Sequence, residues 1–471
     1  FAPAAWGVKV VSLDTGKTLF EHNPQKYFNP ASNAKLYVAA LALDRLGADY
    51  RMRTSLYAAA RPDASGTLKG DLIVYGRGDP TMAASLNGGD YFKPLEPLVN
   101  QLVSAGVRRV EGDLIGDESY FATPAIGAGW EWDDLQEYYG EEVSALTLND
   151  NALDLFVKPA ERVGVPCRIT TGPLTNWVTI INRTETAPKE AESHVVVYRP
   201  VGDNVVYVSG RLPLGGKDYR GSVAVHNPAG LFVALLKEAL LRRGVTVTGR
   251  ARTIDWKYRE VTPFDQTKLV ELGFVESLPL KEILRETLKP SQNLYAQLLL
   301  LQAGAASQPA AGPRLTTEER GVEALNDFLA AAGVKKGDVL LEEGSGLSRR
   351  DIITPNATVA LLTYMHRHRF ADVYRDALPV AGVDGTLQNR MKGTAAAGNA
   401  RAKTGSLRYV YALSGYVTSA AGERLAFSIL LNNYYNAERA SAASSGQRVP
   451  SPREDLDAIV VMLAGFTGRS Q

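Results

Sequence analysis

Three short strings of residues carry side chains that nucleophilic chemistry needs. They are Ser32-Asn33-Ala34-Lys35, Ser291-Gln292-Asn293 and Lys403-Thr404-Gly405, in this order along the chain. Together they supply a hydroxyl nucleophile, an amine that can accept its proton, a polar relay and a cationic anchor for an anion. Each string is short enough to occur by chance, and a second Ser-x-Asn, Ser85-Leu86-Asn87, illustrates this. The order of the strings and the structure predicted around each one give the combination its weight.

The first string is expected at the start of a helix. Pro30 precedes a run from Ala31 to Leu46 that is rich in Ala and Leu, and Gly47 follows it. Ser32 then lies in the first turn, where its N–H can stabilise an oxyanion, and Lys35 follows one turn later within reach of the hydroxyl. A lysine acts as a base only if burial or a neighbouring positive charge lowers its pKa. The alternative is a helix-capping serine and an exposed lysine.

The second string opens another expected helix, from Leu294 to Gln302. Ser291 follows a proline, so the simplest interpretation is a helix cap. The functional interpretation places the Ser291 hydroxyl beside Lys35 as a proton relay. The Asn293 amide would then bind a substrate carbonyl or fix Lys35.

The third string is expected to begin a strand that continues from Leu407 to Thr418 and returns as Arg424 to Asn432, an antiparallel hairpin. A glycine in a strand, here Gly405, lets another backbone approach closely. A peptide could lie along this edge as an added strand. Its terminal carboxylate would be held by Lys403, Thr404 and Ser406, and the Ser406 N–H would complete an oxyanion hole. The alternative is a solvated edge lysine followed by a bend.

The combination resembles the class C low-molecular-mass penicillin-binding proteins, which are three-domain D-Ala-D-Ala carboxypeptidases and endopeptidases. The separation between Lys35 and Ser291 is too long for a single-domain β-lactamase. Further strings match this group along nearly the whole chain. They are Gly76-Arg77-Gly78-Asp79-Pro80, Gly129-Trp130-Glu131-Trp132-Asp133-Asp134, Val143-Ser144-Ala145-Leu146, Gly344-Ser345-Gly346-Leu347-Ser348-Arg349, Leu378-Pro379-Val380-Ala381-Gly382 and Asp384-Gly385-Thr386-Leu387.

The resemblance implies cleavage of peptidoglycan stem peptides through an acyl-serine intermediate, and covalent inhibition by β-lactam antibiotics. Ser32 would be the nucleophile and Lys35 the general base, and Ser291 and Asn293 would line the cleft. Substrate binding would fall to Lys403, Thr404, Gly405 and Ser406. The resemblance also implies an aspartate after the Trp-x-Trp pattern that binds a cationic end of the peptide side chain. Asp134 has that place, with Tyr138 and Tyr139 beside it, and a plain turn carboxylate is the alternative.

Two other functions compete with this prediction. One is a β-lactamase-like hydrolase on the same site, which would need a second base to activate water against the acyl-enzyme. The other is a non-catalytic scaffold that binds the cell wall through the inserted regions. No Gly-x-Ser-x-Gly elbow, phosphate-binding loop or zinc pattern occurs, so neither a metal nor a cofactor is expected. His366 and His368 are expected to be solvated.

Composition limits the partners and the compartment. The net charge is +1, which gives no indication of nucleic-acid binding, and the single cysteine, Cys167, cannot form an internal disulfide. No apolar run approaches the ~20 residues of a membrane helix, and no signal peptide is visible. Phe1 in place of an initiator methionine suggests a processed start. An extracytoplasmic location, in the periplasm or cell envelope, is inferred from the expected substrate alone.

The predicted fold is a multidomain α/β protein. A hairpin around Asp14-Thr15-Gly16 and the hairpin near the C-terminus predict one antiparallel sheet flanked by helices, including a last helix near 455–466. This penicillin-binding domain takes residues 1–54 and 262–471. A strand at 72–75, a helix at 95–105 and a strand at 107–115 predict a parallel sheet in an inserted α/β domain, 55–152 and 214–261. Short alternating runs predict a small all-β domain at 153–213, and 303–312 and 440–452 are expected as loops.

Overall fold

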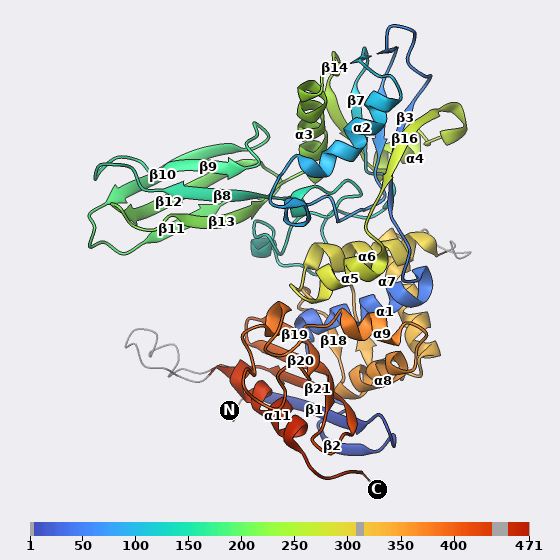
Figure 1. Cartoon of the computed structure of the whole chain (residues 1–471), viewed down its shortest axis with the longest axis vertical. Coiled ribbons are helices and arrows are strands. Elements are labelled where there is room, and N and C mark those ends of the chain that lie inside the picture. The colour runs from blue at the N-terminus through green and yellow to red at the C-terminus, as the bar shows by residue number, and fades with distance from the viewer. Residues whose placement is uncertain (1–3, 308–314, 436–450, 471) are drawn as a thin grey trace. The chain divides into compact units, whose positions relative to one another are not determined.

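The computed structural model describes residues 4–307, 315–435 and 451–470 of the chain. These residues fold as two compact units (Figure 1). The first unit comprises Phe1–Tyr50, Gly127–Gly129 and Pro279–Gln471, and the second comprises Arg51–Ile126 and Trp130–Leu278. The mixed α/β class agrees with the prediction. Residues 262–278 fold with the second unit because a strand at 270–276 pairs there with a strand at 53–58.

Both ends of the chain contribute to one five-stranded sheet in the first unit. Its order is β19-β20-β21-β1-β2, and every pair is antiparallel. The strands are β1 (Ala5–Ser12), β2 (Thr18–His22), β19 (Arg401–Leu407), β20 (Val410–Thr418) and β21 (Arg424–Asn432). The two predicted hairpins, β1–β2 and β20–β21, are therefore present and meet where β1 pairs with β21.

The third string does not begin β20, as the sequence predicted, but lies inside a separate strand, β19. A turn at Arg408 and Tyr409 separates the two strands, and Tyr409 has a φ of +66°, which reverses the chain. The alternating residues of 401–418 indicate strand structure but do not locate this turn, because it contains no glycine or proline. The third string still lies at an edge of the sheet, as predicted, because β19 is the end strand.

Helices cover both faces of this sheet (Figure 1). On one face, apolar residues of β1, β20 and β21 pack with Leu456 and Val460 of α11 (Pro452–Gly465). On the other face, α8 (Pro355–His366) contacts β21 and β1. The last helix, α11, begins at Pro452, three residues before its predicted start. Residues 440–450 of the expected C-terminal loop lie outside the described residues.

A buried helix carries part of the first string. Ala31–Asn33 form a short 3-10 turn, η1, and α1 (Ala34–Leu46) continues from it. The ten residues from Ala34 to Leu43 are all buried, so α1 is enclosed on every side. Its neighbours are α5 (Leu280–Leu288), α6 (Asn293–Ala306) and α7 (Thr317–Ala331). Residues 303–306, expected as loop, form the end of α6.

The second unit contains the predicted parallel strands. β5 (Leu72–Tyr75), β7 (Leu114–Asp117) and β15 (Ala251–Ile254) run parallel, and β3 (Arg53–Ala58) and β16 (Val270–Glu276) complete the sheet in the order β15-β7-β5-β3-β16. The strand predicted at 107–115 is two short strands, β6 (Arg109–Val110) and β7, in different sheets. The helices of this region include α2 (Glu96–Ser104) and α3 (Pro228–Arg242).

The region predicted to be all-β, 153–213, belongs to two three-stranded sheets, β10-β12-β11 and β13-β8-β9, and β13 lies beyond its predicted end. The strands are β8 (Ala152–Lys158), β9 (Arg168–Gly172), β10 (Thr179–Ala187), β11 (His194–Tyr198), β12 (Val205–Pro213) and β13 (Tyr219–Ala224). One hydrophobic cluster includes residues of these strands and of α2 and α3. The division of this unit into an α/β domain and a small β domain therefore stays a prediction. Within the described ranges, no helix has the length and apolar character required to cross a bilayer.

We expect Leu41→Ala to destabilise the first unit strongly. Leu41 is fully buried in the middle of α1. Removal of three buried carbons from a packed core costs about 2–5 kcal/mol, depending on how far the site collapses. Chemical denaturation followed by circular dichroism measures the change. Arg45→Ala, an exposed position on the same helix, is the control and should stay within about 0.5 kcal/mol of the wild type. Equal effects of both changes would contradict the enclosed position of α1.

Candidate active site

The structure brings the serine and the lysine of the first string together. Lys35 Nζ lies 3.0 Å from Ser32 Oγ. The amine also donates to Asn293 Oδ1 at 2.5 Å and to the Ser345 carbonyl at 2.7 Å. Lys35 is fully buried, which excludes the alternative of an exposed lysine.

These three partners orient the lone pair of a neutral Lys35 amine. A charged lysine has three N–H donors, whereas a neutral amine has two and one lone pair. The Asn293 side-chain oxygen and the Ser345 carbonyl oxygen can only accept hydrogen bonds, so each must receive an N–H. The hydroxyl of Ser32 is the one partner of the three that can donate. A neutral Lys35 therefore directs its lone pair at the Ser32 hydroxyl, as a general base requires.

The second string supplies a strained serine and the first residue of α6. Ser291 has a φ of +72°, in the left-handed region that costs a non-glycine residue about 1 kcal/mol or more. The N-cap of α6 is Gln292, without a side-chain capping bond, so the interpretation of Ser291 as a cap is wrong. Asn293 fixes Lys35, which was one of its two predicted roles.

Lys403 of the third string lies in the same site. It is fully buried on β19, and its Nζ donates to Ser291 Oγ at 2.7 Å and to the Thr404 carbonyl at 2.8 Å. Burial lowers the pKa of Lys403 well below the usual lysine range, and the positive charge of Lys35 lowers it further. The Ser291 hydroxyl, expected beside Lys35, is thus a hydrogen-bond partner of the second lysine.

Another loop fastens the second string to the third. Thr404 Oγ1 bonds to Thr386 Oγ1 at 2.8 Å. The Thr386 N–H donates to the Lys289 carbonyl at 2.9 Å, two residues before Ser291. The Lys289 ammonium lies 2.6 Å from Asp384 Oδ2. The residues 384–387, which carried part of the sequence resemblance, therefore hold Ser291 against β19.

A glycine allows β19 to approach the turn that carries Ser32. A Cβ on Gly405 would lie 2.7 Å from the Pro30 carbonyl oxygen and 3.1 Å from Ala31 Cβ, closer than side chains tolerate. The predicted close approach of a backbone at Gly405 is therefore present, and the approaching backbone is the chain's own. Asn33 adds a bond from its Nδ2 to Ser414 Oγ on β20, at 2.8 Å.

Asn29, which no sequence pattern gave reason to select, also holds the turn that carries Ser32. Asn29 Oδ1 accepts from the N–H of Ala31, whose φ is +44°. Asn29 also exchanges hydrogen bonds with Asn432 at the end of β21, at 2.7 and 3.2 Å. Its Nδ2 donates to the carbonyl groups of Ser348 and Asp351. Residues 29–33 are thereby tied to β21 and to the 345–351 loop, and no local sequence signal marks this role.

The predicted specificity residues belong to the second unit. Asp134 ends a short 3-10 turn, Trp132–Asp134, and is half-buried. The Tyr138 and Tyr139 rings meet edge to face at 5.5 Å. Burial and the negative charge of Asp134 raise the pKa of Tyr139 to about 12. These three residues form one local cluster, and their role toward a substrate stays a prediction.

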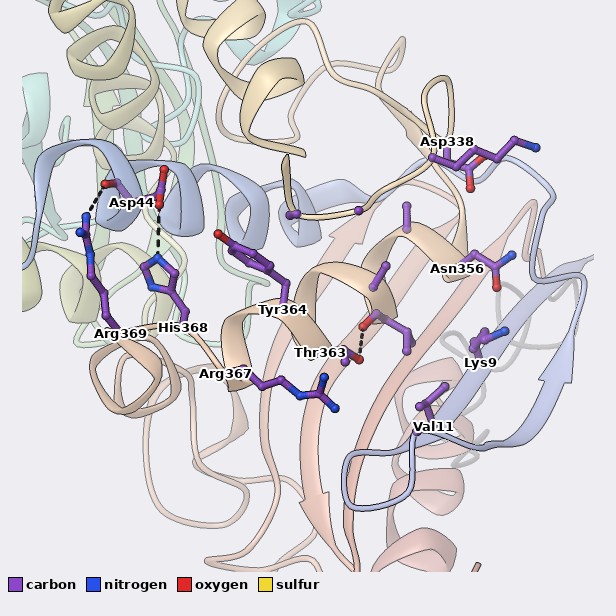
Figure 2. Close-up of a pocket in the computed structure, with 17 residues that line it drawn as sticks. Lys9, Val11, Asp44, Asp338, Asn356, Thr363, Tyr364, Arg367, His368 and Arg369 are labelled. Atoms are coloured by element: carbon purple, nitrogen blue, oxygen red, sulfur yellow. Dashed lines mark hydrogen bonds and ion pairs between the residues drawn. The ribbon is translucent and has the colours of Figure 1, made fainter. Parts of the chain in front are cut away.

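A groove of about 880 Å³ also opens in the first unit, beside α8 (Figure 2). Residues from β1, α1 and α8 line it, and none of the predicted catalytic residues does. At one end, His368 Nε2 lies 3.3 Å from Asp44 Oδ1, and Arg369 donates to the Asp44 carbonyl (Figure 2). The expectation that His368 is solvated is wrong, because its side chain is 7% exposed.

Comparison with known proteins shows the family of the chain. A family model described as D-Ala-D-Ala carboxypeptidase 3 (S13) matches residues 2–449. The chain belongs to this peptidase family, which confirms the resemblance and the enzymatic class predicted from the sequence. It is 35% identical to a D-alanyl-D-alanine carboxypeptidase of Actinomadura sp. (strain R39), over 99% of this chain and 82% of the relative.

Two further comparisons concern Haemophilus influenzae. The chain is 26% identical to D-alanyl-D-alanine carboxypeptidase DacB of that organism, over 90% of this chain and 84% of the relative. The structure of the present chain is similar to the crystal structure of penicillin-binding protein 4 (dacB) from the same organism, with a TM-score of 0.78, 25% identity and 92% of each chain covered. This similarity confirms the predicted fold class.

The lowered pKa of Lys403 predicts how stability depends on pH. An unfolded lysine titrates near pH ~10.4, so between the folded and unfolded values the unfolded chain binds more protons and stability rises with pH. Lys403→Met removes this dependence while it fills the same space. Water can hydrate Ser291 and Thr404, which are only partly buried. We expect the variant to melt at a higher temperature at pH 7 and to gain less stability between pH 7 and 10.

Thermal unfolding at several pH values measures both effects. Lys335→Met, at an exposed lysine of the same unit, is the control and should reproduce the wild-type dependence. A lower melting temperature for Lys403→Met at pH 7, with the wild-type dependence of stability on pH, would show that burial of the Lys403 amine does not destabilise the folded state.

Proposed function

We propose that the chain cleaves the D-Ala-D-Ala end of peptidoglycan stem peptides with Ser32 as nucleophile and Lys35 as general base. One observation carries this proposal: two groups that only accept hydrogen bonds hold the Lys35 amine, and the Ser32 hydroxyl lies 3.0 Å from it. A serine hydroxyl is a weak nucleophile without a base at this distance. The family to which the chain belongs supports the choice of substrate.

The reaction follows from these contacts. Ser32 Oγ attacks the carbonyl carbon of the scissile peptide while its proton passes to Lys35 Nζ. The oxyanion that forms accepts from the N–H groups of Ser32 and Ser406, in the predicted oxyanion hole. The C–N bond then breaks, the terminal D-Ala leaves as an amine with a proton from Lys35, and an ester remains on Ser32. Water hydrolyses the ester and restores the hydroxyl.

Lys403, Thr404 and Ser406 are the proposed binding residues for the terminal carboxylate of the substrate. They lie on β19, and an extended peptide could pair with this edge strand. A carboxylate beside Lys403 would stabilise its charged form, by the charge-assisted bonds that make such contacts strong. Ser291, bonded to Lys403, then lies between the carboxylate anchor and the reacting bond as the polar relay.

The same site is proposed to react with β-lactams and to release the product slowly. The site residues Ser32, Lys35, Ser291, Asn293 and Lys403 provide hydroxyls, amines and an amide, and none is a carboxylate that would activate water. This favours a long-lived penicilloyl adduct over efficient β-lactamase turnover. Action on stem peptides also implies an extracytoplasmic location. The balance between carboxypeptidase and endopeptidase cleavage depends on which stem peptides the site binds.

Replacement of the nucleophile tests the proposal. We expect the wild type to release D-Ala from a stem peptide that ends in D-Ala-D-Ala and to gain the mass of one penicillin after brief exposure. Ser32→Ala should lose both properties, because no oxygen remains to form the ester. Intact-protein mass spectrometry and an assay for free D-Ala measure them, with Ser85→Ala, the serine of the second Ser-x-Asn, as the control. Equal D-Ala release by wild type and Ser32→Ala would exclude Ser32 as nucleophile, and rapid return to the apo mass would favour a β-lactamase.

Asp134→Ala is expected to change side-chain preference without abolishing activity. The proposed partner of Asp134 is a cationic group at the end of the stem-peptide side chain, so its removal affects only substrates that carry this group. We expect kcat/KM to fall about 5–20-fold for a peptide with a free amine, in line with the loss of one charge-assisted bond. The acetylated peptide should react as with the wild type. An unchanged ratio between the two substrates would remove Asp134 from the substrate site.

A further inference from the structure

A buried glutamate organises the loop that presents the Ser345 carbonyl to Lys35. Glu343 is fully buried, and its Oε2 accepts from the Ser345 N–H at 2.7 Å and from Ser345 Oγ at 2.6 Å. Its Oε1 accepts from the Gly346 N–H at 2.5 Å and, at 3.4 Å, from the Ser348 N–H. One carboxyl group thus holds four donors of residues 345–348 and fixes the direction of the backbone between them.

A second carboxyl group completes the environment of Glu343. Burial raises the pKa of Asp351 well above its usual range, and the adjacent Glu343 charge raises it further. A side-chain hydrogen bond between Asp351 and Glu343 raises the pKa of Asp351 as well, and Asp351 Oδ1 accepts from the Glu342 N–H at 2.9 Å. The neutral form of Asp351 is thus favoured beside Glu343, because burial and a like charge both oppose its ionisation.

The loop is also packed between the two elements that carry the catalytic groups. A Cβ on Gly344 would lie 2.7 Å from the Ala296 carbonyl of α6, and one on Gly346 would lie 1.9 Å from the Ala31 carbonyl. The Gly344 N–H donates to Gln297 Oε1, one helical turn after Asn293. The Ser345 carbonyl consequently has little freedom to move relative to Lys35, to which it is bonded at 2.7 Å.

We propose that Glu343 is a positioning residue for the general base, acting through the Ser345 carbonyl. This carbonyl is one of the two acceptors that direct the Lys35 lone pair at Ser32. If Glu343 no longer holds the loop, the carbonyl rotates away, and the amine can turn its lone pair from the hydroxyl. The inference rests on the proposed function of Ser32 and Lys35, and it assigns Glu343 a role in acylation that is separate from substrate binding.

Glu343→Gln tests the proposal, because it keeps the shape of the side chain but places an NH2 group opposite donors. Saturation kinetics with a chromogenic cephalosporin separate the acylation rate constant from the dissociation constant of the noncovalent complex. We expect the acylation rate constant to fall about 10–100-fold, as misplacement of a catalytic group does. The dissociation constant should change less than about threefold, because Lys403 and Thr404 are untouched.

Glu423→Gln is the matched control, since Glu423 is also buried and hydrogen-bonded in the first unit but lies at the β20–β21 turn. It should acylate as the wild type. Ser345→Ala, which retains the carbonyl but removes one bond to Glu343, should slow acylation by a smaller factor and serves if Glu343→Gln fails to fold. Titration with fluorescent penicillin corrects every rate for the folded fraction.

Three outcomes would overturn the proposal. The first is an acylation rate constant of Glu343→Gln within twofold of the wild type, and the second is an equal loss of acylation rate and of affinity in that variant. The third applies if Glu343→Gln fails to fold, and it is a wild-type acylation rate constant for Ser345→Ala. Failure of the proposed function gives a different result, since Ser32→Ala would then still form the adduct. The two hypotheses are thus tested by separate variants.

Discussion

Two lysine amines buried in one site are the constraint on which the rest of this structure depends. Lys35 and Lys403 are both fully buried, and the charge of the first lowers the pKa of the second. A buried ammonium is costly unless acceptors surround it, and two of them repel each other. The site relieves this cost through acceptors from four separate segments and, at Lys403, by favouring the loss of a proton. Under the proposed roles, Lys35 also needs a neutral amine to act as the base, so burial and chemistry impose the same requirement.

The segments that satisfy this requirement are held in unfavourable backbone conformations. Ala31 and Ser291 both have positive φ angles, and Gly346 and Gly405 allow contacts that a side chain would prevent. Such strain costs on the order of 1–3 kcal/mol at each residue and persists only where the surroundings determine the structure. The enclosed helix α1 and the bonds of Asn29 to β21 provide that support. The backbone strain at Ala31 and Ser291 therefore lies within the site.

The sequence allowed the prediction of each local element around the site but not of every contact. Helix signals placed Ser32 and Lys35 one turn apart, and strand periodicity predicted the sheet from both chain ends. The alternating pattern could not locate the turn at Tyr409, which has no glycine or proline to mark it. The roles of Asn29, Ser345 and Glu343 depend on backbone groups that meet only after folding, so residue types do not reveal them. Asp134 remains predicted from resemblance alone.

Each buried lysine is hydrogen-bonded to one hydroxyl, Lys35 to Ser32 and Lys403 to Ser291, and also donates to oxygen atoms that only accept. Each pair can therefore exchange a proton between an amine and a hydroxyl. The coupling between the lysines connects them: a substrate carboxylate at Lys403 would favour the charged form of that amine. Because the carboxylate brings a negative charge together with that proton, the net charge beside Lys35 does not rise, and the neutral form of the Lys35 amine is not opposed. Under the proposed roles, the group that the enzyme recognises thus charges its own anchor, Lys403, without charging the base.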